Sequence, residues 1–387
     1  MKLKDKISWL MGRVQKSLFP YLDECFDTPM SEQEQRLVAI LEIVQVEKYV
    51  FSSATSYWRG RKPLDRQAMA RAFVAKTLYR FPTTIDLIRA LKATRNLRRI
   101  CGFITTDGIP SESTFSRAFS EFAAGELGKQ ANDTLVKDYL SDEIIGHISR
   151  DSTAITGREK PVEKVKELKK PRKRGRPAKG EKREPVVAKR LDRQVDLSAE
   201  DAIRELPTCC DRGTKKNAKG YKTSWNGYKL HLDINDAGLP ISAVVTSASL
   251  HDSQVAIPLI KLTSSKVTYL YDLMDAAYDA SKINETSRQL GHVPIIDKNA
   301  RSKEVMPKAP HEVERYKERS SAERANSRLK EDFGANNVMV RGYSKVSLSA
   351  FNAGSDCFIC RSTHTVTRIN FQRTEPTLRQ ETRVYVV

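Results

Sequence analysis

The chain has 387 residues, enough for two or three domains with separate cores, and its hydrophobic content of 39% is ordinary for a soluble protein. Its 67 lysines and arginines exceed its 48 aspartates and glutamates by 19, which predicts a polyanionic partner, nucleic acid before an anionic membrane. No apolar run reaches the ~18–20 residues of a spanning helix, and the N-terminus lacks the apolar core of a secretory signal, so we expect a cytoplasmic protein without a membrane partner.

Residues from Gln33 to Phe122 repeat their apolar positions at helical spacing, with breaks at Pro82 and Pro110. A helix at 84–93, a basic stretch and a capped helix start at 110–119 are typical of a helix-turn-helix that reads DNA. The alternative is simple packing in a helical bundle. We predict a helical N-terminal domain over residues 1–140 that binds DNA or supports assembly.

The periodicity changes at Glu143, where a predicted strand ends in Asp151. Aspartate is depleted in strands, so Asp151 indicates either a functional carboxylate or a turn at the strand end. The segment from Gly157 to about Arg193 then carries 16 basic and 6 acidic side chains. So much charge with so few apolar residues predicts disorder in the absence of a partner.

Within this basic segment, Arg174, Gly175 and Arg176 resemble the core of an AT-hook. In that motif a flat Arg-Gly-Arg segment lies in the narrow minor groove of A·T-rich DNA. The alternative is a basic tether that binds phosphates without reading sequence. Both interpretations favour DNA as the partner.

The order that follows is strand, turn, strand, helix, strand, helix and strand. Residues 225–234 alternate with period two, so that Tyr228, Leu230, Leu232 and Ile234 share one face. A turn at 235–238 leads to a return strand at 241–246. The remaining predicted elements are a helix at 253–262, a strand at 267–271 followed by Asp272 and Asp275, a helix at 280–290 and a strand at 293–296.

The next predicted helix places Tyr316, Arg319, Glu323 and Lys330 within one sector of ~60°. A carboxylate flanked by phosphate-binding groups suits metal-assisted cleavage of a nucleic-acid backbone. The alternative is an exposed helix crossed by ion pairs.

The six cysteines are scattered, which argues against a disulfide framework and for a reducing compartment. Cys357, Cys360 and His364 have the spacing of half a zinc site, but adjacent Cys209 and Cys210 would complete it poorly. We therefore expect buried, inert thiols.

This order of elements resembles the ribonuclease H-like fold, and residues 145–365 resemble the catalytic domain of bacterial insertion-sequence DDE transposases with a Y-R-E-K signature. The matching motifs are 151–155, 227–231, 251–252, 275–279 and 316–330. The resemblance implies an α/β fold: a mixed sheet flanked by helices at 141–365, interrupted by a basic insertion at 157–215. An all-α domain precedes it, and a tail at 366–387 follows.

The resemblance implies that Asp151, Asp275 and Glu323 bind two Mg²⁺ or Mn²⁺ ions. Tyr316, Arg319 and Lys330 would hold DNA phosphates. The second aspartate is open, because Ala277 replaces a glycine common in the family. Asp272, nearer the strand end, is the second candidate, and Asp279, a candidate helix cap, is the third. His251 and Asp252 would either support the site or form a turn and cap.

The implied function is excision and strand transfer of an insertion sequence by phosphodiester hydrolysis and transesterification. The implied partners are double-stranded DNA, as terminal repeats and target, and a second copy of the chain in a synaptic complex at the nucleoid. Two alternatives remain: an inactive DNA-binding regulator derived from a transposase, and a ribonuclease H-like nuclease without strand transfer.

Overall fold

The computed structural model describes residues 29–50, 64–163, 188–216, 219–299, 307–336, 338–352 and 354. The AT-hook-like residues Arg174, Gly175 and Arg176, the Cys357–His364 group and the tail at 366–387 therefore lie outside the described residues. Within the described ranges, no helix is both long enough and apolar enough to cross a bilayer.

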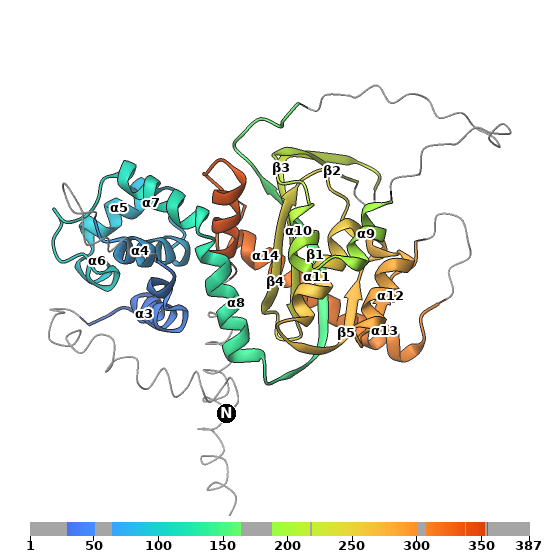
Figure 1. Ribbon diagram of the computed structural model, residues 1–387. Coiled ribbons are helices and arrows are strands. Elements are labelled where there is room, and N and C mark those ends of the chain that lie inside the picture. Colours follow the sequence, from blue (N-terminus) through green and yellow to red (C-terminus); the bar gives the residue numbers. More distant parts are fainter. Residues whose placement is uncertain are drawn as a thin grey trace, which may run out of the picture.

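The first part of the chain is a helical lobe, as the sequence predicts (Figure 1). Phe73 lies in its core and makes edge-on ring contacts with Phe115, Phe119 and Phe122. Two helices begin at capping boxes, in which a hydroxyl side chain and an acid three residues later each accept a backbone N–H. The elements are α3 (Glu32–Val44), η1 (Val46–Tyr49), α4 (Arg66–Leu78), α5 (Thr84–Ala93), α6 (Arg95–Cys101), α7 (Glu112–Ala124) and α8 (Leu127–Leu140).

A mixed sheet forms the second part, and its central strand is β1. This strand pairs antiparallel with β3 and parallel with β5, and β6 continues the sheet in parallel beyond β5. The other edge of β3 pairs with β2 along its first half and with β4 along its second half. The strands are β1 (Ile144–Thr156), β2 (Asp211–Lys216), β3 (Lys222–Asn235), β4 (Pro240–Ser247), β5 (Thr268–Met274) and β6 (Val293–Ile296).

Helices cover both faces of this sheet, which confirms the predicted ribonuclease H-like α/β class. On one face α14 (Ser320–Glu331) packs on β1 and β3, and on the other α11 (Ser253–Ser264) packs on β3 and β4, with α12 (Ser281–Gln289) against β6. The side chains predicted to share one face of β3 do so: Leu230 and Leu232 lie in a core with Ala322 and Leu329 of α14. The period-two pattern therefore identified the buried face correctly.

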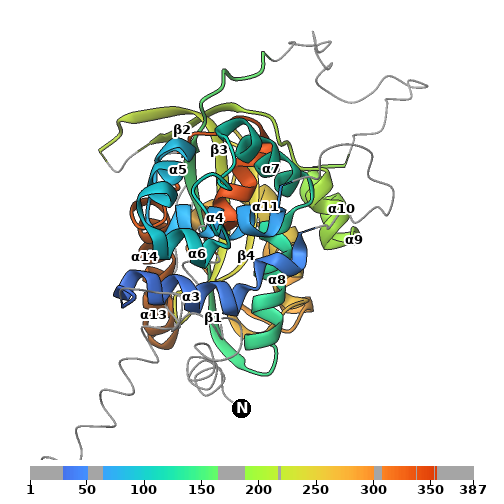
Figure 2. The same ribbon diagram turned by 90° about the vertical axis from the view of Figure 1, so that its left-hand side faces the viewer.

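The lobe and the sheet are joined through a common core. Helix α8 lies between them in Figure 1 and contacts β4, and the lobe covers the sheet when viewed from its side in Figure 2. The apolar cluster of the lobe continues into Ile148, Ile241 and Tyr269 of the sheet. Lys266, before β5, forms a nearly buried ion pair of 2.6 Å with Asp133 of α8.

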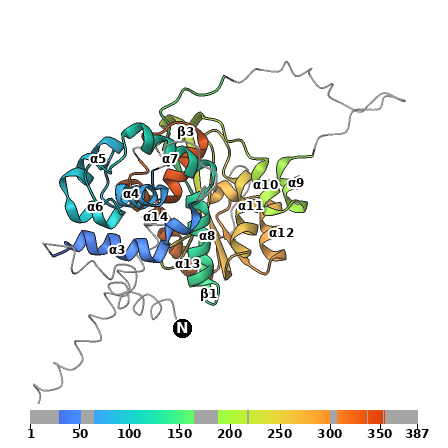
Figure 3. The same ribbon diagram turned by 60° about the vertical axis from the view of Figure 1, so that its left-hand side comes forward.

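The insertion differs from the expected disorder at both of its ends. At its start, Glu159 accepts a hydrogen bond from the Tyr228 hydroxyl. At its end, α9 (Arg190–Asp196) and α10 (Ala199–Arg204) pack on α11, away from the lobe (Figure 3). The Lys261 ammonium of α11 donates to three carbonyls at the end of α9, and Leu191 and Val195 pack against the core beneath. Two apolar residues in a basic context are too sparse a pattern to predict this helix.

Gly227 lies where β1, β2 and β3 meet. It pairs with Thr156 of β1 on one side and with Asp211 of β2 on the other, at a φ of 148°. A Cβ atom here would lie 2.3 Å from the Ile155 carbonyl oxygen and 2.4 Å from the Gly157 nitrogen. Only glycine therefore allows the three strands to approach this closely.

We predict that Gly227→Ala lowers the free energy of unfolding by about 3 kcal/mol or more, through backbone strain and overpacking. Urea unfolding followed by circular dichroism measures this. The control is Gly108→Ala in an exposed turn, where the nearest atom to a new Cβ is the Thr105 hydroxyl at 3.4 Å. Equal stability of the two variants would contradict the strand contact.

Candidate active site

The sequence predicted that Asp151 ends its strand, but Asp151 lies inside β1. The parallel pairing with β5 stops at Ser149–Leu273, whereas the antiparallel pairing with β3 continues through Asp151–Leu232 to Thr156. Asp151 is therefore the first residue on the α14 face of β1 that lies beyond the last pair with β5. Its side chain is 20% exposed and accepts a 2.9 Å hydrogen bond from the Asn326 amide of α14.

Asp275 directly follows β5 and faces the same site as Asp151. Its Oδ1 accepts a 2.9 Å hydrogen bond from the Ala277 backbone and so caps the short helix η2 (Ala276–Tyr278). This fixes the carboxylate at the carboxyl end of a parallel strand, beside the strand that carries Asp151. Its other oxygen is left to face the site.

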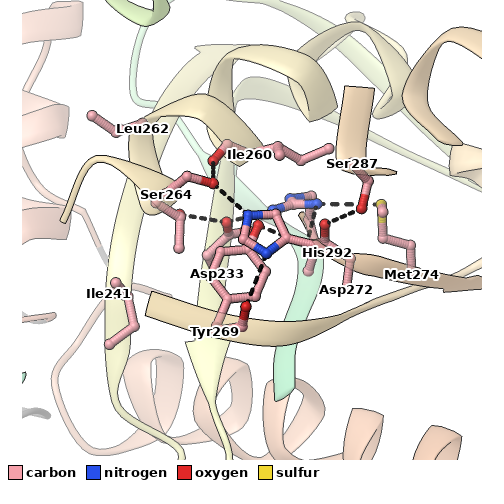
Figure 4. Close-up of polar contacts among 12 residues, drawn as sticks. Asp233, Ile241, Ile260, Leu262, Ser264, Tyr269, Asp272, Met274, Ser287 and His292 are labelled. Atoms are coloured by element: carbon pink, nitrogen blue, oxygen red, sulfur yellow. Dashed lines mark hydrogen bonds and ion pairs between the residues drawn. The ribbon is translucent and has the colours of Figure 1, made fainter. Parts of the chain in front are cut away.

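Asp272, the second candidate, belongs to a separate, buried group of charged side chains. It is fully buried, pairs with Arg150 at 3.2 Å and accepts hydrogen bonds from Ser287 and Tyr269 (Figure 4). Arg150 also pairs with Asp233 at 2.6 Å. Because side chains alternate along β1, this buried group lies on the opposite face of the sheet from Asp151.

Asp279, the third candidate, holds the loop after β6. It accepts a 3.1 Å hydrogen bond from the Asn299 backbone and pairs with Lys298 at 3.4 Å. The residue at the N-cap of α12 is Ala280, so the expectation that Asp279 caps this helix is wrong.

The predicted helix from Tyr316 to Lys330 is three consecutive pieces. These are α13 (Pro310–Tyr316), the 3-10 turn η3 (Lys317–Arg319) and α14. The hydroxyl of Ser149 on β1 donates to the Glu318 carbonyl and contacts the Ser321 hydroxyl, so the tightened turn lies directly on the central strand. Arg319 is thereby brought over the two aspartates.

The Arg319 guanidinium lies among all three predicted metal ligands. Its Nη1 is 3.0 Å from Glu323 Oε1, and its Nη2 is 3.7 Å from Asp151 Oδ1 and 3.8 Å from Asp275 Oδ2. Burial raises the pKa of Asp151, and the Arg319 charge opposes this rise. Burial by itself would lower the pKa of Arg319, but Tyr316 and the surrounding carboxylates raise it overall.

Tyr316 is bound inward and is not displayed beside Arg319 on an open helical face. Its hydroxyl lies 2.6 Å from Asp297 Oδ2 and 3.2 Å from the Met274 carbonyl, and the Lys308 ammonium lies 3.1 Å from the centre of its ring. Burial and the Asp297 hydrogen bond raise the pKa of this phenol. Sequence reasoning missed Asp297, although an acid directly after the strand at 293–296 was the available signal.

Lys330 lies in the last turn of α14 and meets another cation there. Its pKa is lowered, first by burial and then by Lys215 of β2, with Asp151 opposing the change. Among the described residues, neither ammonium has an ion-pair partner. Sequence reasoning missed Lys215 because it lies far from Lys330 in the sequence, and only the fold brings the two positive charges near each other and near Asp151.

Asp252 has a structural role, but not as a helix cap. It pairs with Lys229 at 2.8 Å and lies 3.9 Å from the buried His231 ring, and its side chain makes no capping hydrogen bond to α11. His231 in turn contacts the Thr246 hydroxyl at 3.0 Å. Burial lowers the pKa of His231 to about 4, against an opposing effect of Asp252.

Helix α7 was expected to be the second helix of a helix-turn-helix, but the basic stretch that should connect it to α5 is itself a helix, α6. Phe115, Phe119 and Phe122 are buried in the lobe, whereas the polar side chains at its first turn are exposed. There the Ser111 hydroxyl contacts Thr114, which also accepts from Arg117. The packing interpretation is therefore confirmed for the buried face of α7, and DNA reading by its exposed face stays a prediction.

The three carboxylates are arranged around a cation, but not yet as a metal site. Within the described ranges, no three histidine, cysteine or acidic side chains are close enough to hold a metal ion. Arg319 separates them, and Glu323, whose side chain is 62% exposed, reaches it from the rim. Carboxylate oxygens around one partly buried positive charge are nevertheless the ligand type that Mg²⁺ and Mn²⁺ prefer.

We predict that Asp272→Ala lowers the free energy of unfolding by about 3–5 kcal/mol, because Arg150 is left buried with an incomplete set of partners. Asp275→Ala should change it by only about 1 kcal/mol, mainly through the lost cap. Urea unfolding of both variants measures the difference. The reverse order of stabilities would exchange the roles assigned to these two aspartates.

We predict that His231 makes the free energy of unfolding decrease as the pH is lowered. The unfolded chain takes up a proton near the ordinary pKa of 6.5, whereas the folded protein does so only near 4. The contribution is complete above pH 6.5 and decreases by about 1.4 kcal/mol per pH unit between those values. Compared with His231→Gln, the wild type should lose about 2 kcal/mol more between pH 7 and pH 5.

The surface substitution His311→Gln is the control for this pH dependence, since His311 is exposed. It should lose the same stability as the wild type over that interval. A wild-type pH profile that His231→Gln leaves unchanged would contradict the buried neutral state of His231.

Comparison with known families adds an independent finding. Residues 147–353, more than half of the 387, match the family model described as "Transposase DDE domain". Residues 26–121, in the helical lobe, match a second model described as "Transposase domain". No curated protein and no solved structure matched the chain.

Proposed function

Because the chain belongs to the transposase DDE domain family, we propose that this transposase cuts DNA at the ends of an insertion sequence and joins those ends to a target. Water attacks a phosphodiester at the element's end and frees a 3′-hydroxyl, and this hydroxyl then attacks a phosphate of the target strand. The observation that carries the proposal is the convergence of Asp151, Asp275 and Glu323 on one positive charge.

The residues that would hold Mg²⁺ or Mn²⁺ are Asp151, Asp275 and Glu323. By analogy with two-metal sites, they would hold a pair of ions. When bound, such ions lower the pKa of the nucleophile and neutralise charge on the reacting phosphate. The Arg319 guanidinium supports this assignment, because the same three carboxylates already surround a cation. Asn326 holds one oxygen of Asp151 and leaves the other directed into the site.

Most of the remaining residues bind and orient DNA. Lys330 and Lys215 supply charge for a phosphate on one side of Asp151, and Arg319 has the fork of N–H donors that fits a phosphate. Tyr316 does not contact DNA in this proposal but holds the ends of β5 and β6 beside the site, through the Met274 carbonyl and Asp297. The basic insertion and the exposed start of α7 would supply further contacts to DNA.

Double-stranded DNA is the partner in this proposal, and two copies of the chain would hold two element ends in a synaptic complex at the nucleoid in the cytoplasm. A DNA-binding regulator derived from a transposase is the second candidate. It needs the basic surfaces but gains nothing from a convergent carboxylate site. A nuclease without strand transfer would share the whole site and differs only in its products.

We predict that the purified protein, with Mg²⁺ or Mn²⁺, cleaves a DNA fragment that carries the element's end and joins it to a second duplex. Asp151→Asn and Glu323→Gln should each reduce both reactions by about 10³-fold or more, because metal ligands act as a unit. Electrophoresis of end-labelled DNA measures cleavage and joining.

Retained DNA binding by both variants in a gel-shift assay is the control. Cleavage without joined products would support the nuclease, and tight wild-type binding without cleavage would support the regulator. Equal activity of wild type and variants would reject the assigned carboxylates.

A further inference from the structure

We propose that Arg319 occupies the metal position when DNA is absent, so that divalent ions bind fully only after a DNA phosphate draws its guanidinium away. Metal binding would then be coupled to substrate binding through one side chain. This inference rests on the proposed function, because it assumes that Asp151, Asp275 and Glu323 are the metal ligands.

The position of Arg319 is the first support. Its two terminal nitrogens lie within 3.0–3.8 Å of an oxygen from each of the three carboxylates, and its side chain is only 18% exposed. A guanidinium stays charged at any physiological pH and has no free lone pair with which to bind a metal ion. It therefore competes with a metal ion both for the oxygen lone pairs and for the space between them.

The charge of the site leads to the same conclusion. Three carboxylates with one guanidinium carry a formal charge of −2, and they carry −3 once the guanidinium has left. Like charges at such short separations repel strongly near a protein surface, so a divalent ion beside Arg319 is disfavoured. Withdrawal of Arg319 removes the repulsion and releases the oxygens together.

A DNA phosphate near Asp151 would give the displaced guanidinium a new partner. Lys215 and Lys330, which have no ion-pair partner among the described residues, attract a phosphate towards Asp151. The Nε of Arg319 is buried without a hydrogen-bond partner in the described structure, so it has a donor left to offer. A phosphate oxygen would satisfy that donor and a terminal nitrogen in the two-point geometry that guanidinium groups favour.

The backbone supports this movement. Arg319 ends the 3-10 turn η3 between two α-helices, and such interruptions are common at functional hinges. Glu323, its closest partner, is 62% exposed and can follow a metal ion or remain with the arginine. Arg324, the next arginine of the chain, is exposed and has no partner among the described residues, so it provides a matched control.

The test measures Mn²⁺ binding by electron paramagnetic resonance of the free ion, using the full-length wild type, Arg319→Gln and Arg324→Gln. Each protein is titrated alone and with a duplex that carries the element's end. A protein with Asp151→Asn and Glu323→Gln, titrated with the same duplex, gives the Mn²⁺ that DNA and other sites bind. Thermal melting verifies that each variant is folded.

We expect the wild type and Arg324→Gln to bind Mn²⁺ weakly alone and on the order of tenfold more tightly with DNA. Arg319→Gln should bind Mn²⁺ on the order of tenfold more tightly than the wild type without DNA, and DNA should add little. Because coupling is reciprocal, Mn²⁺ should tighten DNA binding by the same factor in the wild type and not in Arg319→Gln.

Equal or weaker Mn²⁺ binding by Arg319→Gln would overturn the inference while leaving the proposed function intact, provided that the wild type binds Mn²⁺ at the carboxylates. Absence of Mn²⁺ binding by the wild type with DNA would reject both. If Arg319→Gln does not fold, Arg319→Lys decides, because its shorter reach to the carboxylates should increase Mn²⁺ affinity without DNA. Unchanged affinity in Arg319→Lys would then overturn the inference.

Discussion

The buried guanidinium of Arg150 joins the three central strands of the sheet. It extends from β1 to Asp233 of β3 and to Asp272 of β5, and its Nη1 also lies 3.3 Å from the Met274 sulfur. A charge in this position is tolerated only while its partners surround it. Since neighbouring side chains on a strand face opposite ways, burying Arg150 on one face sends Asp151 to the other, and Met274 is followed at once by Asp275.

The two faces of the sheet thus hold charge in different ways. On the face of the sheet that holds Arg150, the arginine and its two aspartates are shielded from water and form ion pairs with one another, although Arg150 Nε and Asp233 Oδ1 have no hydrogen-bond partner among the described residues. On the opposite face, the carboxylates are partly exposed, and Arg319 lies 3.7 and 3.8 Å from Asp151 and Asp275, farther than Arg150 lies from either of its aspartates. The Arg150 group is therefore suited to rigidity, and the Arg319 group is suited to exchanging one cation for another.

Much of the fold could be predicted from the sequence, because period-two and helical spacing record which side of each element is buried. Tyr228, Leu230, Leu232 and Ile234 identified the inner face of β3 in this way. The end of β1 could not be predicted, because it depends on the unequal lengths of two neighbouring strands. Helix α9 was missed because a few tertiary contacts stabilise a segment whose composition indicates disorder.

The candidate site was predictable in its residue types and less so in its contacts. Helical spacing brought Arg319 and Glu323 together correctly, but it placed Tyr316 on the same open face, whereas tertiary contacts bind its hydroxyl to Asp297. Proximity in sequence could not separate Asp272 from Asp275, since burial and not spacing distinguishes them. Lys215 was missed because only the fold brings it near Lys330.

The common core of the lobe and the sheet limits how such a protein can diversify. Ile148, Ile241 and Tyr269 of the sheet are covered by the cluster to which the N-terminal helices contribute, and the Lys266–Asp133 pair crosses the same junction. Removing the lobe would uncover this apolar surface, so the helices are not an exchangeable module. Substitutions that preserve the fold are therefore confined to the outer faces of these helices, while the inner faces remain fitted to the sheet.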